Sequence, residues 1–158
     1  MQDTILRRQL VELLEGGQAH LEPEQALAGV PFEAWATRAR HAPYTLWQLL
    51  EHARICQWDI LEFSRRREHV SPDHPEGYWP ATDGPPDDAA VAASIEAFNR
   101  DLQEMIALVE DPAVDLFARI EWGDGQTILR EAMLVADHNA YHLGQFVLVR
   151  KLLGVWPT

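Results

Sequence analysis

The sequence has few of the features that mark secreted or membrane proteins. It contains a single cysteine, Cys56, so it cannot form an internal disulfide, and nothing in it points to an oxidising compartment. No apolar run approaches the roughly 18 residues of a membrane span, and the first residues lack the basic and apolar segments of a signal peptide. We therefore expect a cytoplasmic protein with no membrane partner.

Positive charge is also scarce. The chain has 13 lysine and arginine residues against 25 aspartate and glutamate residues, and its formal net charge is −12. Such a chain repels phosphate backbones and anionic lipids, so we expect it not to bind nucleic acid. The one short basic cluster, residues 65–67, lies near the end of an expected helix, where positive charge suits the helix dipole.

Length and composition suit one globular domain. The chain has 158 residues, of which 47% are hydrophobic, enough for a sizeable core. No internal repeat, low-complexity tract or linker divides it. We therefore treat residues 1–158 as a single domain.

The spacing of apolar residues predicts an all-α protein. Thr45 with Gln48 three residues later predicts a capping box at one helix start, and Asp87 or Asp88 is expected to cap another. Four long helices joined by loops are typical of a four-helix bundle, in which ligand sites form between facing helices. The four helices are expected at about residues 4–14, 45–66, 87–111 and 127–153.

The remaining segments are expected to be mostly loop. A short helical turn is expected near residues 23–28, and residues 115–122 fit either a short strand or an extended connector. Prolines and glycines predict a loop over residues 67–86, and its aromatic pair, Tyr78 and Trp79, indicates that this loop packs back on the body. Loops of this length in compact domains are usually functional or cover the surface.

The strongest chemical signal is a pair of histidines on the last expected helix. His138 and His142 are four residues apart, so both imidazoles lie on one face and can chelate one ion. Neighbouring apolar positions indicate that this face is interior, where unpaired imidazoles would be costly. The alternative is a pair that faces solvent or is hydrogen-bonded in the core. Asn139 stands where zinc proteases of the HExxH type carry a glutamate, so a metalloprotease is disfavoured.

A third ligand should come from another helix, and His52 is the best candidate. It lies near the apolar positions Leu49, Cys56 and Ile60, although a histidine at the edge of the core with a backbone partner is the alternative. Three histidines with an open coordination position would suit zinc, nickel or iron(II), and would activate a water or a thiol.

Four other residues are weaker candidates for the site or its surroundings. Cys56 is one turn beyond His52 and is either a fourth ligand or, more often for such a residue, a small buried hydrophobe. Asp59 could orient a ligand, but a solvated or capped carboxylate is the more common case. Gln145, one turn past His142, is a candidate polar contact in the pocket. His20 could approach from the first helix.

Several neighbouring residues are expected to be structural. Asp137 should point off the ligand face toward the surface. Trp47 and Tyr141 are expected to fill the core rather than bind substrate. Gly144, inside the last helix, is expected to permit close helix packing.

Two segments resemble the DinB-like (DinB/YfiT-type) family of metal-binding helical bundles. They are residues 47–52, Trp-Gln-Leu-Leu-Glu-His, and residues 137–145, Asp-His-Asn-Ala-Tyr-His-Leu-Gly-Gln. The resemblance implies an up-down-down-up bundle and a divalent metal held by His52, His138 and His142. It also implies frequent homodimers, and members that join a low-molecular-weight thiol to a substrate or isomerise a substrate with the help of a thiol.

Three functional hypotheses follow. The first is a metal-dependent enzyme, of the thiol S-transferase or hydrolase type, acting on a small-molecule substrate. The second is a non-catalytic metal-binding or stress-associated bundle, in which a fourth protein ligand closes the site. The third is a metal-free interaction module, which predicts that His52 lies far from the histidine pair.

Overall fold

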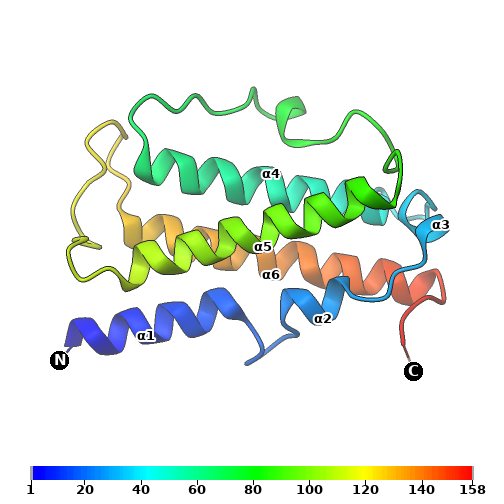
Figure 1. Cartoon of the computed structure of the whole chain (residues 1–158), viewed down its shortest axis with the longest axis horizontal. Coiled ribbons are helices and arrows are strands. Elements are labelled where there is room, and N and C mark those ends of the chain that lie inside the picture. The colour runs from blue at the N-terminus through cyan, green and yellow to red at the C-terminus, as the bar shows by residue number, and fades with distance from the viewer. Residues whose placement is uncertain (1, 158) are drawn as a thin grey trace.

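The chain is all-helical in a computed structural model that describes residues 2–157 (Figure 1). The only strand-like pairing within that range is an isolated bridge between Arg119 and Thr127, so residues 115–122 form a connector rather than a strand. None of the described helices is both long and apolar enough to cross a membrane. The long helices are α1 (Gln2–Glu15), α4 (Leu46–Arg65), α5 (Asp88–Glu110) and α6 (Ile128–Leu152), and the short ones are α2 (Pro23–Leu27), α3 (Phe32–Trp35) and the 3-10 turn η1 (Glu76–Tyr78).

The long helices lie side by side along the molecule. Figure 1 shows α1 and α6 running in one direction and α4 and α5 in the other. The α4 and α5 helices are parallel because the segment between them, residues 66–87, travels back over the length of α4. Helix α6 packs against α4, α5 and α1, and the short α2 continues the line of α1 along α6. This arrangement sets the middle of α4 against the middle of α6.

Side-chain caps fix where three of the long helices begin. The predicted capping box is confirmed. The backbone N–H of Gln48 donates to Thr45 Oγ1 over 3.2 Å, and the side-chain oxygen Oε1 of Gln48 accepts from the backbone N–H of Thr45 over 3.1 Å. Asp87, rather than Asp88, caps α5, and Thr127 caps α6. Each such cap typically contributes about 1 kcal/mol.

The core consists of two apolar clusters, one toward each end of the long helices. One cluster includes Trp35, Trp47 and Phe146, and the other includes Leu61 and Met105. The expectation that Trp47 fills the core is confirmed.

Two buried amides lie where the two clusters meet. Gln57 donates to the carbonyl of Phe98 over 2.6 Å, and Asn139 donates to Gln57 Oε1 over 2.7 Å. Buried polar groups are stable only when they are hydrogen-bonded. This pair therefore ties α4, α5 and α6 together at one fixed register.

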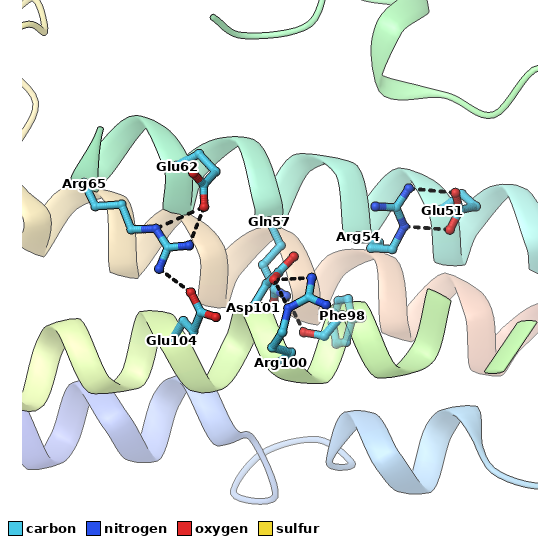
Figure 2. A network of polar contacts seen from close by, with 9 residues as sticks. All are labelled: Glu51, Arg54, Gln57, Glu62, Arg65, Phe98, Arg100, Asp101 and Glu104. Carbon is cyan, nitrogen blue, oxygen red and sulfur yellow. Dashed lines mark hydrogen bonds and ion pairs between the residues drawn. The ribbon is translucent and has the colours of Figure 1, made fainter. Parts of the chain in front are cut away.

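A polar seam runs between the parallel helices α4 and α5 (Figure 2). Arg65 of α4 reaches both Glu62 on its own helix and Glu104 on α5. Nearby, Arg100 pairs with the buried Asp101 over 2.8 Å. Neighbouring parallel helices bring like ends of their dipoles together, and the bridge from Arg65 to Glu104 offsets part of that repulsion.

Two expectations for α6 are wrong. Tyr141 does not fill the core, because 64% of its surface is exposed. Gly144 does not permit close packing within the chain, because it is exposed and a Cβ added there would meet no atom within 4 Å. Gly144 instead borders a small surface pocket together with His20 and Leu21. The short helix α3, which follows Pro31, was not expected from the apolar spacing.

Candidate metal centre

Three histidines from two helices converge at the centre of the α4–α6 contact. His52 comes from α4, and His138 and His142 come from successive turns of α6. Their ring centroids are 5.1 Å (His52 to His138), 4.5 Å (His52 to His142) and 4.4 Å (His138 to His142) apart. One nitrogen from each ring lies within 4.8 Å of the other two, so the three residues could hold one metal ion. The metal-free module predicted a distant His52, and that prediction is wrong.

Two of the three rings make hydrogen bonds that leave one nitrogen free. His52 Nδ1 lies 2.8 Å from the carbonyl oxygen of Tyr78. Because a carbonyl can only accept, Nδ1 carries the proton and Nε2 keeps its lone pair. His142 Nδ1 lies 3.2 Å from Gln145 Oε1 and donates to it in the same way. A ligand histidine commonly donates its other N–H to an oxygen in this manner, which fixes the ring orientation.

His138 provides the test of whether the site fits a metal. Its Nδ1 is buried and has no hydrogen-bond partner. An unpaired buried polar atom is costly, and each such case in a folded protein calls for an explanation. A cation shared by the three rings and bound through this nitrogen would give it a partner. The residues present therefore fit a divalent metal.

The electrostatics of the cluster favour neutral rings. Burial, followed by the proximity of His142 and His52, lowers the pKa of His138 to about 4. Burial and the neighbouring His52 lower the pKa of His142 to about 4 as well. Burial also lowers the pKa of His52, against the hydrogen bond to Tyr78, which raises it. Coordination requires neutral imidazole, and this is the form that the site holds at neutral pH.

The loop before α5 packs back on the body, as the sequence indicated, and Trp79 in this loop lies against His52. Trp79 stacks flat on the His52 ring, with centroids 3.9 Å apart and planes 6° apart. Tyr44 stacks in turn on Trp79, with centroids 4.2 Å apart. The ring of His52 therefore has little freedom to rotate.

Asp59 is buried and hydrogen-bonded, so of the two expected alternatives, a solvated or a capped carboxylate, the solvated one is wrong. Only 8% of its surface is exposed, because His69 and Tyr78 of the loop after α4 lie against it. One of its oxygens lies 2.7 Å from His69 Nε2, and the other accepts from the Tyr78 hydroxyl over 2.7 Å. The main chain of Tyr78 is the hydrogen-bond partner of His52. Asp59 is thus placed to orient a ligand indirectly, through Tyr78.

This relay makes a prediction for Tyr78. In Tyr78→Phe the hydroxyl that anchors the loop to Asp59 is lost, while the carbonyl that holds His52 remains. We expect zinc affinity to fall about tenfold, at the lower end of the range for partners of metal ligands, with the far-ultraviolet circular dichroism unchanged. Tyr141→Phe, which alters a tyrosine hydroxyl outside the relay, should leave the affinity unchanged. Equal zinc affinities in the two variants would show that the Tyr78 hydroxyl does not contribute to metal binding.

The remaining candidates occupy different places. Cys56 is half-buried, with Sγ 3.7 Å and 3.8 Å from the two nitrogens of His52, but it is not in the group of converging ligand atoms. Burial and the charge of Asp59 raise the pKa of its thiol to about 12. His20 is exposed beside the carbonyl of Leu21 and is also outside that group. Asp137 is exposed, as expected.

Sequence reasoning missed the part that the loop plays in the site. Tyr78, Trp79 and His69 all contact His52 or Asp59 from the loop over residues 67–86, and none of the three was predicted to contact the site. The available signal was a pair of aromatic residues inside a proline-rich loop, too far along the chain from His52 to be linked to it by spacing. Comparison of the chain with models of known protein families, with curated proteins and with solved structures finds no match.

Proposed function

We propose that this protein is a cytoplasmic, metal-dependent enzyme whose single divalent ion, zinc, nickel or iron(II), is held by His52, His138 and His142. One observation carries the proposal: three neutral nitrogen ligands converge within 4.8 Å of one another. Among the described residues, no carboxylate or thiol belongs to that group. Three protein ligands with a vacant position characterise catalytic zinc sites, whereas structural zinc sites have four protein ligands.

The resemblance to the DinB-like family supports this proposal and gives it a reaction class. The directions of the four long helices agree with the up-down-down-up order of that family. The three converging histidines are also the positions that the resemblance marks as ligands. We therefore propose a thiol S-transferase acting on a small-molecule substrate, with hydrolysis of such a substrate as the alternative.

The ion would supply Lewis acidity, lowering the pKa of a thiol or water that takes its open position. The protein supplies the positioning. Tyr78 and Trp79 fix the ring of His52, and Gln145 fixes that of His142. Tyr141 stands edge-on to the His142 ring, with centroids 4.9 Å apart, and is the exposed aromatic group nearest the cluster. A substrate that reaches the ion from this side would meet the Tyr141 ring.

Cobalt(II) substitution tests the open position directly. We expect cobalt in the Cys56→Ser variant to bind with the same affinity as in the wild type and to show no thiolate charge-transfer band. A low-molecular-weight thiol added to this complex should produce that band. Cys56 is the only cysteine in the sequence, so in this variant the added compound is the only thiol present. The binding curve and the near-ultraviolet spectrum are the measurements.

Other outcomes of this experiment would change the conclusion. A charge-transfer band in the wild type before thiol is added, lost in Cys56→Ser, would make Cys56 a fourth ligand and the site structural. A cobalt spectrum that does not respond to thiol, in a protein that hydrolyses activated esters or amides, would favour the hydrolase.

A further inference from the structure

The segment that joins α4 to α5, residues 66–87, forms a strap that returns along α4 (Figure 1). At the start of α4, the Thr45 hydroxyl donates to the carbonyl of Asp83 in the strap over 2.6 Å. Toward the end of α4, His69 of the strap lies 2.7 Å from Asp59. Between these two attachments the strap is held at one more level, which is the metal centre.

This middle attachment joins the strap to a proposed metal ligand. The carbonyl of Tyr78 accepts from Nδ1 of His52 over 2.8 Å, and Trp79 stacks on the same ring. A cation bound at the other nitrogen of His52 would polarise the N–H at Nδ1. Hydrogen bonds from charged donors are roughly twice as strong as neutral ones. The ion would therefore strengthen the bond that holds the strap at this level.

The strap has little else to keep it closed. Every residue of the strap is at least partly exposed. The backbone hydrogen bonds within it belong to a turn at its start and to the short turn around η1. Segments with few buried contacts and exposed hydrogen bonds open locally at a low cost in free energy. We therefore expect the strap to open more readily than the helices that flank it.

Tyr78 lies across Cys56, the only cysteine in the sequence. Cys56 comes four residues after His52 and three before Asp59, so all three share one side of α4. Tyr78 bridges the outer two, with its carbonyl at His52 and its hydroxyl 2.7 Å from Asp59. Burial and the charge of Asp59 raise the pKa of the Cys56 thiol. The thiol should therefore react slowly while the strap is closed, and its reactivity reports opening.

We propose that metal binding closes the strap over this side of α4, and that loss of the ion opens it at Tyr78 and Trp79 and exposes Cys56. This coupling rests on the proposed metal centre and adds its regulation. Coupling between two equilibria is reciprocal, so the ion favours the closed strap by the factor by which the closed strap raises metal affinity. Partners of metal ligands typically change that affinity about 10–100-fold.

Alkylation of Cys56 measures the open state. Iodoacetamide reacts with the thiolate, and mass spectrometry of the native protein follows the modified fraction with time. We expect saturating zinc to slow alkylation at least about tenfold relative to protein stripped with a chelator. At the same zinc occupancy, Tyr78→Phe should react about tenfold faster than the wild type, because a hydrogen bond to a carboxylate is lost. Tyr141→Phe, which alters an exposed tyrosine outside the strap, should react at the wild-type rate.

Hydrogen exchange distinguishes closure of the strap from direct shielding of the thiol by the ion. The amides of Tyr78 and Trp79 donate to carbonyls within the strap. We expect zinc to slow their exchange. The amides of Val114 and Ala118, which donate within the connector between α5 and α6, are the matched comparison and should not respond.

Chelator competition on the same samples shows whether zinc is bound, so failure of the strap and failure of the metal centre can be told apart. Zinc that binds but changes neither the alkylation rate nor the exchange of the strap would overturn the coupling and leave the metal centre standing. Slower alkylation without slower exchange of Tyr78 and Trp79 would mean that the ion itself shields Cys56, which would also overturn it. A protein that binds no zinc would contradict the metal centre, and the coupling with it.

Discussion

Replacing His138 with alanine is expected to lower the affinity for zinc more than about a hundredfold, exceeding the effect typical of residues that only support a ligand. His138 is the ring whose buried Nδ1 has no hydrogen-bond partner, and it lies against both other rings of the cluster. Without it, two ligands on different helices remain, and neither the geometry nor the number of donors suffices for a stable site. Competition with a chromophoric chelator measures the affinity.

The control is His20→Ala. His20 is an exposed histidine outside the converging group, so its loss should leave the affinity unchanged. If His20→Ala weakened binding as much as His138→Ala, the bound zinc would be held adventitiously by surface histidines rather than by the cluster.

Zinc is expected to raise the melting temperature of the metal-free protein by about 10 °C. A ligand that binds only the folded state, present at about a thousand times its dissociation constant, stabilises that state by about 4 kcal/mol. In a domain of this length, each kcal/mol shifts the melting temperature by about 2–4 °C. An ion held by the three histidines would also join α4 to α6. Differential scanning calorimetry of protein stripped with a chelator, before and after addition of zinc, measures the shift.

Two comparisons show whether this shift comes from the site. Chelator added to the zinc-loaded protein should return the melting temperature to that of the stripped protein, and His138→Ala should show no shift at all. An equal shift in His138→Ala would mean that zinc stabilises the fold somewhere other than at the three histidines.

The sequence predicts the helices well because their signals are local. Apolar spacing and caps such as Thr45 act within one or two turns, and α4, α5 and α6 begin where those caps place them. The pair His138 and His142 is local in the same sense, since residues that are four apart on one helix share a face. A third ligand depends on how α4 packs against α6. The apolar neighbours of His52 on its own helix made it a candidate, and the resemblance to a known family favoured it further.

The errors fall where tertiary contacts decide the outcome. Asp59 looks like a surface carboxylate from its neighbours on α4, but the returning loop buries it against Tyr78 and His69. Tyr141 looks like a core residue from its chemistry, but it lies on the open face of α6. Gly144 looks like a packing glycine, but it is exposed and a Cβ added there would meet no atom within 4 Å. Helical periodicity gives the angle of a residue around its helix, but not what the rest of the chain places there.

Metal content is the measurement that tests the three-histidine site most directly. Untagged protein, purified without added metal, should contain about one zinc, nickel or iron ion per chain by elemental analysis, as expected for one mononuclear site. The double variant His52→Ala, His142→Ala should contain none, although it remains folded. A wild-type protein that holds no stoichiometric metal, even after reconstitution with each of the three ions, would contradict the site and leave the three histidines as a hydrogen-bonded cluster in a helical interaction module.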